Sequence, residues 1–321
     1  MQIRTIGILG GTGFVGSHLV NRLTKDGYQL RVLTRSRERH RNLWVLPTLQ
    51  LIEADVHDPF QLKQHLDGCD AVINLVAILN ERRHDGIGFR HVHVDLPRKI
   101  IDVCRENRIK RLLHMSALNA DAESGPSFYL RTKGEAEELV HEAADDNLKV
   151  TSFRPSVIFG PEDDFFNRFA KLLKLTPIFF PLACPNARFA PVYVGDVTEA
   201  IAGMIDTPGS FGKRYNLCGP RTYTLRELVE YTASTLRLHR IVIPLNDRLS
   251  RMQARTLEFV PGKPFSRDNY LSMQVDSVCR GNDLEALGIT PAALEAVVPR
   301  YLTGRSQEAR FQRFRSRARR S

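Results

Sequence analysis

Short apolar runs alternate with longer amphipathic segments along the first half of the chain. The runs have the length and character of buried strands, and they lie at residues 5–9, 30–33, 49–52, 71–76, 111–115 and 149–153. Between them, apolar residues recur at helical spacing, which predicts helices at about 13–26, with Gly27 as C-cap, at 96–107 and from about Tyr129 onward. Strands and helices that alternate in this way predict an α/β fold with a doubly wound parallel sheet.

The regular alternation ends near Gly160, after which prolines and loops are more frequent. We therefore predict a first domain over residues 1–160, with segments at about 188–220 that return to it. Residues 161–304 would form mainly a smaller C-terminal lobe that shapes a substrate site, and residues 305–321 a flexible basic tail.

A glycine-rich turn, Gly10-Gly11-Thr12-Gly13-Phe14-Val15-Gly16, joins the first predicted strand to the first predicted helix. It fits both the G-x-G-x-x-G and the G-x-x-G-x-x-G spacing. Glycines at these positions allow a tight turn, close approach of the backbone to a pyrophosphate, and close packing of helix on strand. The helix N-terminus then offers N–H groups to the phosphates. A strand before the turn and a helix after it favour a dinucleotide site in a Rossmann-type domain over a purely structural turn.

The residues after the second strand indicate which dinucleotide is bound. An acidic residue there would bind the ribose 2′-hydroxyl of NAD. This chain has Thr34-Arg35-Ser36-Arg37 instead, with Arg39 and Arg41 nearby. Arginine offers a planar donor fork for a 2′-phosphate and a flat face for adenine. We expect NADP(H), with NAD(H) or a merely solvated arginine loop as alternatives.

A tyrosine and a lysine lie four residues apart near the start of the predicted helix at Tyr129. In Tyr129-Leu130-Arg131-Thr132-Lys133 the two side chains share one helix face. A tyrosine hydroxyl is a poor acid or base at neutral pH, and a nearby ammonium group stabilises its phenolate. Placed after the fifth strand of a dinucleotide fold, Tyr129 is a candidate general acid or base, and a surface pair is the alternative.

Composition excludes several other classes of protein. With 321 residues, 42% hydrophobic and 26% charged, the chain is neither disordered, collagen-like nor a small disulfide scaffold. The net charge of +10 is uneven, because residues 305–321 hold seven arginines and one glutamate. Such a tail is typically solvated, and attraction to an anionic membrane or to nucleic acid are the alternatives. The remaining 304 residues carry only +4, and no nucleic-acid motif is present.

Cysteine use and apolar runs bear on the compartment. Five scattered cysteines with no CxxC pair predict free thiols in a reducing compartment and no zinc site. We expect no signal peptide, and the oily stretch 177–183 is too short and too proline-rich to span a membrane. Phe179 and Phe180 in this stretch predict either an apolar lip over a pocket or ordinary loop packing. Metal is not expected at His84, His91 and His93.

These features together resemble the short-chain dehydrogenase/reductase superfamily, on its extended or atypical branch of epimerase/dehydratase-like proteins. More narrowly, the chain resembles the family of the NADPH-binding accessory subunit of respiratory complex I and its bacterial relatives. The matching segments reach from the glycine turn almost to the tail, at residues 10–16, 74–77, 114–118, 129–135, 153–163, 190–197 and 215–220.

The resemblance implies a role for each matched residue. Tyr129 and Lys133 match the catalytic pair and would also contact the cofactor. The other implied cofactor contacts are Gly10, Thr12, Gly13, Phe14, Val15 and Gly16 for the pyrophosphate, Arg35, Ser36 and Arg37 for the adenosine phosphate, Asp55 and Val56 for adenine, and Leu75, Val76, Ala77, Pro155, Ser156 and Val157 for the nicotinamide side. For Asp55, capping of the helix before Pro59 is the alternative.

One position departs from the pattern of active members. They place a Ser or Thr slightly beyond the fifth strand to orient the substrate carbonyl, whereas here Ser116 is followed by Ala117 and Leu118. Ser116 is the remaining candidate for that catalytic hydroxyl, and a plain strand-end residue is the alternative reading. The resemblance also implies that NADPH in the complex I subunit is structural and is not turned over.

Two functions follow as expectations. The first is an NADP(H)-dependent oxidoreductase that acts on a carbonyl or hydroxyl group of an apolar, quinone-like small molecule. The second is a non-catalytic, NADPH-bound accessory or assembly factor of a membrane respiratory or quinone-biosynthesis complex. We expect a cytoplasmic protein under either function, with peripheral contact to an anionic membrane or a membrane complex through the tail.

Overall fold

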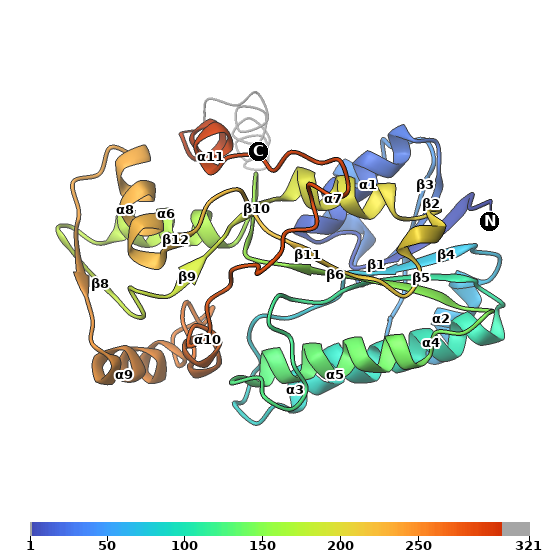
Figure 1. The fold of residues 1–321 in the computed structure, drawn as a ribbon, viewed down its shortest axis with the longest axis horizontal. Coiled ribbons are helices and arrows are strands. Elements are labelled where there is room, and N and C mark those ends of the chain that lie inside the picture. Colours follow the sequence, from blue (N-terminus) through green and yellow to red (C-terminus); the bar gives the residue numbers. More distant parts are fainter. Residues whose placement is uncertain (1, 304–321) are drawn as a thin grey trace. The chain divides into compact units, whose positions relative to one another are not determined.

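The computed structural model describes residues 2–303, so the predicted basic tail lies outside the described residues. The chain forms two units (Figure 1). The first unit contains the chain up to Pro155, Gly195–Leu217 and Cys279–Ile289. The second contains Ser156–Val194, Cys218–Val278 and the described residues from Thr290 on.

The first unit is built on a seven-stranded sheet in which all strands are parallel, in the order β11-β6-β5-β4-β1-β2-β3. This is the α/β architecture that the apolar runs predict. The strands are β1 (Thr5–Leu9), β2 (Gln29–Thr34), β3 (Leu49–Glu53), β4 (Ala71–Asn74), β5 (Arg111–Met115), β6 (Lys149–Pro155) and β11 (Arg214–Leu217). Their buried, β-branched and leucine-rich sequences suit a sheet that is covered on both faces.

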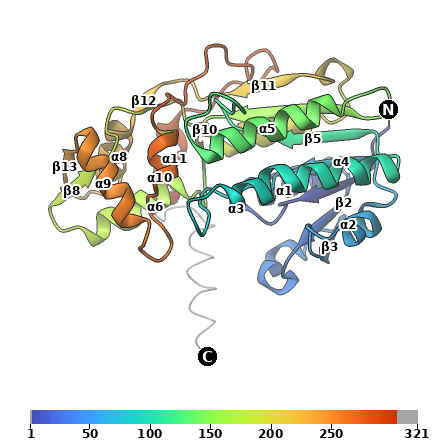
Figure 2. The same ribbon diagram turned by 90° about the horizontal axis from the view of Figure 1, so that it is seen from below.

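Helices cover both faces of this sheet (Figures 1 and 2). One face carries α1 (Phe14–Lys25) and α7 (Val194–Gly203), which the ion pair between Arg22 and Glu199 joins at 2.7 Å. The other carries α2 (Pro59–Leu66), α4 (Leu96–Glu106) and α5 (Phe128–Glu142), whose apolar faces form one core with the strands. A short helix, α3 (Ile87–Arg90), precedes α4.

The strand order reverses between β1 and β4, because the chain leaves β3 at one edge and returns to pair β4 with β1. In open α/β sheets, ligands bind at the carboxyl ends of the strands next to such a reversal. The residues that follow β1 and β4 therefore surround the expected site. They are held together there, since the N–H of Leu75 donates to the carbonyl oxygen of Leu9 at 2.9 Å.

The second unit has short paired strands and helices around its own apolar core. Its strand pairs are β7 (Ile158–Phe159) with β10 (Val192–Tyr193), β8 (Phe179–Leu182) with β13 (Ile241–Pro244), and β9 (Arg188–Phe189) with β12 (Tyr223–Thr224). Its helices are α6 (Phe165–Leu175), α8 (Leu225–Thr235), α9 (Asp247–Leu257), α10 (Arg267–Ser272) and α11 (Leu294–Leu302). None of the helices within residues 2–303 combines the length and apolar character needed to cross a bilayer.

The unit boundaries differ from the predicted domain boundaries. Residues 156–160, 188–194 and 218–220, which the sequence places with the first domain, group with the second unit. The segment 279–289, which the sequence places in the lobe, groups with the first unit. The cause is a main-chain and side-chain connection to β11. The N–H of Asn216 donates to the Asp283 carboxylate at 2.6 Å, and the N–H of Asp283 donates back to the carbonyl oxygen of Asn216 at 3.0 Å.

Several local predictions need correction. The C-cap of α1 is Asp26, and Gly27 follows it with φ +86°, a conformation that suits glycine. Phe179 and Phe180 lie on strand β8 rather than in a loop, so Phe180 points into the core while Phe179 is 57% exposed.

The prediction of five free thiols is wrong. Cys218 and Cys279 are disulfide-bonded, which spacing along the chain does not reveal. Only Cys69, Cys104 and Cys184 are free thiols, so cysteine use gives no argument for a reducing compartment.

Candidate dinucleotide and catalytic site

The glycine turn between β1 and α1 is packed so closely that two of its positions have no room for a side chain. Gly10 has φ +79°, and a Cβ added there would lie 3.0 Å from the carbonyl carbon of Leu75. A Cβ on Gly16 would lie 2.2 Å from the carbonyl oxygen of Gly10, so α1 packs onto the turn only with glycine at that position.

The N-terminus of α1 suits an anion. Gly13 is the N-cap residue, and no side chain among residues 2–303 caps this helix end. Its first-turn N–H groups therefore carry the partial positive charge that favours a phosphate. The tight glycine turn and the uncapped helix end together fit the pyrophosphate of a dinucleotide.

The arginines after β2 lie on a short 3₁₀ segment, Arg37–Leu43. Arg35, Arg37 and Arg41 are exposed. The guanidinium groups of Arg37 and Arg41 lie 5.1 and 5.6 Å from the ring centroid of Trp44, which the sequence reading did not single out. The segment also meets a carboxylate, because the N–H of Arg37 donates to Glu53 at 2.9 Å. Both signs of charge are therefore present where the adenosine ribose is expected.

The residues assigned to adenine follow β3. The Asp55 carboxylate accepts the N–H of His57 at 2.9 Å, and the cap of α2 is Asp58, which accepts the N–H of Phe60 at 2.9 Å. The helix-cap alternative for Asp55 is therefore wrong. The side chain of Val56 is buried in the core beneath β3, which leaves its backbone for any contact with a ligand.

His57 is a polar group that the sequence reading missed in this region. Its ring stacks on His91 with 4.1 Å between the centroids. Its Nδ1 atom is buried and has no hydrogen-bond partner among the described residues. Burial, followed by the nearby His91, lowers the pKa of His57, so the ring is neutral at neutral pH and offers a donor or an acceptor to a ligand.

The three histidines named from sequence do not converge. His84 contacts Phe128, His91 stacks on His57, and the ring of His93 lies against Tyr129. Each ring thus has a different neighbour.

The segment after β4 is shaped by buried polar side chains. The Asn74 side chain accepts the N–H of Val76 at 3.1 Å and lies 3.3 Å from Nδ1 of His114 on β5. Leu75 and Val76 are half-buried and Ala77 is exposed, as suits residues beside a ligand. Of the other nicotinamide-side residues, Pro155 ends β6, while Ser156 and Val157 belong to the second unit, where Ser156 donates to the carbonyl oxygen of Ser277 at 2.7 Å.

Tyr129 and Lys133 lie one turn apart on α5, whose N-cap Ser127 accepts the N–H of Leu130 at 3.1 Å. Tyr129 is half-buried, with ring centroids of His93 and Phe89 at 5.5 and 6.2 Å. Lys133 is only 1% exposed and its ammonium group donates to the carbonyl oxygen of Met115. Burial lowers the pKa of Lys133 to about 8, against the opposing charge of Glu137. The ammonium group therefore stays mostly protonated at neutral pH.

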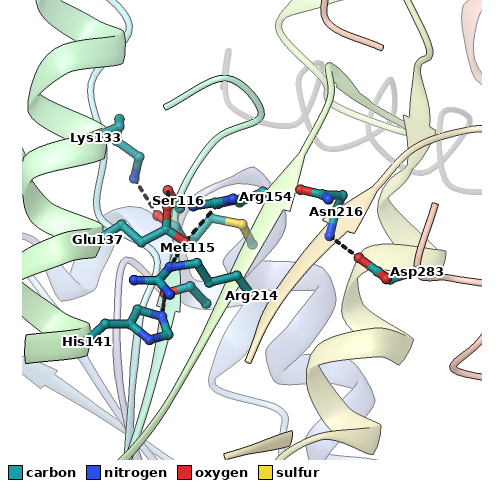
Figure 3. A network of polar contacts seen from close by, with 10 residues as sticks. Met115, Ser116, Lys133, Glu137, His141, Arg154, Arg214, Asn216 and Asp283 are labelled. Atoms are coloured by element: carbon teal, nitrogen blue, oxygen red, sulfur yellow. Dashed lines mark hydrogen bonds and ion pairs between the residues drawn. The ribbon is translucent and has the colours of Figure 1, made fainter. Parts of the chain in front are cut away.

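Ser116, directly after β5, belongs to a network of polar contacts around Glu137, which lies one turn beyond Lys133 on α5 (Figure 3). Its hydroxyl donates to the Glu137 carboxylate at 3.1 Å, and Glu137 is 2% exposed. Arg154 donates to the same carboxylate at 2.8 Å, and the Nε atom of Arg214 lies 3.5 Å from it. While the Ser116 proton is directed at Glu137, it is not available to a substrate carbonyl.

Sequence reasoning missed this network, although one signal for it was present. Glu137 follows Lys133 by four residues, so the two lie on the same face of α5. The arginines that reach Glu137 come from β6 and β11, and that proximity is a property of the fold.

Known proteins resemble the chain in sequence and in fold. The model of the NAD dependent epimerase/dehydratase family matches residues 6–218. The chain is 30% identical over 297 residues to "NADH dehydrogenase (ubiquinone) 1 alpha subcomplex subunit 9, mitochondrial" of Rattus norvegicus, covering 90% of this chain and 77% of that protein. It is 29% identical over 203 residues to "Ceramide reductase" of Caulobacter vibrioides, covering 63% of this chain and 61% of the reductase.

Among solved structures, one similar protein is the dTDP-glucose 4,6-dehydratase DesIV from Streptomyces venezuelae with NAD bound. The match has a TM-score of 0.74 and 19% sequence identity, and it covers 96% of this chain and 98% of the DesIV chain. MoeE5 in complex with UDP-glucose and NAD has a TM-score of 0.73 and 18% identity, covering 93% of this chain and 97% of its own. At these identities the likeness shows the fold alone. Together with the family match, it establishes that the chain belongs to the NAD dependent epimerase/dehydratase family.

Proposed function

We propose that this chain is an NADP(H)-binding oxidoreductase that acts on a carbonyl or hydroxyl group of an apolar small molecule. The observation that carries the proposal is the pairing of half-buried Tyr129 with the fully buried ammonium group of Lys133 on α5. The pair follows the fifth strand of a sheet whose glycine turn fits a pyrophosphate.

The roles of the residues follow from their chemistry. The nicotinamide of the bound dinucleotide would supply or accept the hydride. Tyr129 donates its hydroxyl proton to the carbonyl oxygen in reduction and accepts a proton in oxidation. Lys133, held at Met115 and protonated at neutral pH, stabilises the phenolate that Tyr129 forms. Ser116 stays a candidate for orienting the carbonyl only if a substrate draws its hydroxyl away from Glu137.

Two relatives support an apolar substrate. One is named a ceramide reductase, and the other is a ketoreductase of Stigmatella aurantiaca whose substrate name includes a farnesyl group. The second is 29% identical over 174 residues, half of this chain.

A second candidate is favoured by a specific observation. Ser116 is already bonded to the buried carboxylate of Glu137, which is a stable arrangement for a protein that binds NADPH without turning it over. Four relatives are named as the same NADH dehydrogenase subunit. Under this candidate the chain is an accessory factor of a membrane respiratory or quinone-biosynthesis complex, with peripheral contact to the complex or to an anionic membrane.

The Tyr129→Phe variant separates the two functions. In the full chain incubated with NADPH and a panel of apolar ketones and quinones, we expect the variant to lose turnover by about 10³-fold, since general acid catalysis contributes on this order. NADPH affinity should change by less than about threefold, because a hydroxyl lost at a half-buried site costs little binding. Loss of NADPH absorbance measures the rate.

Tyr28→Phe is the matched control, because Tyr28 is also half-buried in the first unit and lies outside the site. Equal turnover in wild type and Tyr129→Phe would refute the role of Tyr129. A wild-type chain that oxidises no NADPH against the panel, yet keeps bound NADPH through dialysis, would establish the accessory function instead.

A further inference from the structure

A π-helical turn interrupts the helix that runs from α3 into α4. It spans His91–Asp95, and the helical segments on either side, Ile87–Arg90 and Leu96–Glu106, adjoin it directly (Figure 2). A π-turn inserts a residue into a helix and turns side chains from their regular positions, at some cost in backbone stability. In its middle, His93 is 1% exposed.

The two ring nitrogens of His93 bond to two different elements. Nε2 accepts the N–H of Ile78, in the segment that follows β4, at 3.1 Å. Because Nε2 is the acceptor, the proton of the neutral ring is on Nδ1. Nδ1 lies 2.9 Å from the hydroxyl oxygen of Thr132 on α5. The Thr132 hydroxyl in turn donates a hydrogen bond to the carbonyl oxygen of Phe128 at 2.8 Å. The Thr132 hydroxyl also lies 3.2 Å from the carbonyl oxygen of Tyr129, so its proton is directed at the α5 backbone and its oxygen accepts from Nδ1 of His93.

The surroundings keep the ring neutral. Burial, and then the charge of Lys133, hold the pKa of His93 well below its ordinary value. The ring edge packs against Tyr129 at 5.5 Å, and Phe89 contacts both rings at 5.6 and 6.2 Å. Thr132 lies in the sequence between Tyr129 and Lys133, so one imidazole touches the helix that carries both proposed catalytic side chains.

We propose that His93 is a positioning residue that ties the 75–78 segment to α5, so that the nicotinamide-facing backbone and Tyr129 keep a fixed relation. This inference rests on the proposed dinucleotide function. Its geometric basis is the pair of hydrogen bonds from one buried ring to Ile78 and Thr132, placed there by the π-turn.

Two substitutions separate the two bonds. In His93→Asn, the amide NH₂ group takes the place of Nδ1 and keeps a donor for Thr132, but nothing reaches the N–H of Ile78. In Thr132→Val, the Ile78 bond stays while the bond to α5 is lost. Thr232→Val is the matched control, since Thr232 is a buried threonine in the second unit that donates to the carbonyl oxygen four residues before it at 2.7 Å.

The experiment uses the full chain and three measurements. These are amide hydrogen exchange at Ile78 without ligand, NADPH affinity from nicotinamide fluorescence, and the affinity of 2′,5′-ADP, which fills only the adenosine half. For His93→Asn we expect Ile78 to exchange about tenfold faster and NADPH to bind about tenfold more weakly, as for one lost buried hydrogen bond. Affinity for 2′,5′-ADP should stay unchanged. Thr132→Val should weaken NADPH in the same selective way, and Thr232→Val should not.

Two results would overturn the positioning role. One is unchanged exchange at Ile78 in His93→Asn, and the other is an equal loss of affinity for NADPH and 2′,5′-ADP, which a merely structural residue would produce. If His93→Asn fails to fold, Thr132→Val tests the proposal by itself, through the comparison of its affinities for NADPH and for 2′,5′-ADP. A wild-type chain that binds neither ligand refutes the dinucleotide function instead, and exchange at Ile78 still shows whether His93 ties the segment to α5.

Discussion

Arg35 is the first residue after β2, and it is exposed on a segment that would meet the adenosine ribose. Its charge reaches the adenine side as well, because it contributes to the lowered pKa of His57. The guanidinium group of the neighbouring Arg37 lies over the ring of Trp44 at 5.1 Å. Arg35 is therefore the residue of this segment on which the 2′-phosphate assignment is best tested.

The Arg35→Ala variant should weaken NADPH binding by about 10- to 100-fold and leave NADH binding nearly unchanged, since only NADPH carries the 2′-phosphate that a guanidinium group binds. Titration with each dinucleotide measures both affinities. Arg98→Ala, which removes an exposed arginine of α4, controls for the change in net charge. An equal loss for NADPH and NADH in Arg35→Ala would contradict the 2′-phosphate assignment.

At the scale of elements, the junction of β1 with α1 depends on how closely the helix approaches the turn. Gly16 lies in the first turn of α1 against the carbonyl oxygen of Gly10, and a methyl group there would be placed at 2.2 Å. The atoms that the methyl group would meet are backbone atoms of Gly10 and Gly11, in the turn directly after the buried strand β1, so they do not yield cheaply. The phosphate site and the packing of α1 are thus one structural feature.

Gly16→Ala should lower the midpoint of thermal unfolding by several degrees and weaken NADPH binding by more than about tenfold, since overpacking costs about 1–3 kcal/mol. Calorimetry and fluorescence titration measure the two effects. Gly203→Ala is the matched control, because Gly203 is also helical and an added Cβ would meet nothing within 4 Å. Wild-type stability and affinity in Gly16→Ala would show that α1 can shift away from the turn.

The helices and strands could be predicted from the sequence more fully than the contacts between them. The strands at 5–9 and 111–115 have the predicted bounds, because buried parallel strands are continuous apolar runs. The π-turn at His91–Asp95 leaves no such mark, since it arises where His93 is drawn to partners on two other elements. The carboxylate of Glu137 was likewise hidden, because an acidic residue on a helix is usually solvated.

At the scale of the whole molecule, Arg111 connects the parts of the first unit that are distant in sequence. This side chain of β5 is fully buried and donates to the carbonyl oxygens of Lys149, Met204 and Ile205 at 2.8–3.2 Å. It also donates to the hydroxyl groups of Thr151 and Ser210 at 2.7 and 2.9 Å. Burial lowers the pKa of Arg111 to about 10. These five neutral oxygen atoms surround the guanidinium group in place of water, and we refer to them as the Arg111 socket.

Arg111→Lys should destabilise the first unit by about 3 kcal/mol, because one ammonium group cannot serve acceptors arranged for a planar fork. The only tryptophan of the chain, Trp44, lies in the first unit, so its fluorescence during urea unfolding reports on that unit. Arg98→Lys is the control, because Arg98 is an exposed arginine of α4. An unchanged urea midpoint in Arg111→Lys would mean that the socket adapts to a smaller cation.

The socket also has a consequence for synthesis on the ribosome. When the nascent chain has emerged as far as Pro155, strands β1 to β6 are present, but the acceptors at Met204, Ile205 and Ser210 are still to be translated. The edge strand β11, which covers β6, comes later still. A half-made chain therefore holds an unsatisfied arginine and an open sheet edge, both of which disfavour early closure. The first unit therefore completes its fold only after residues 156–194 of the second unit have been made.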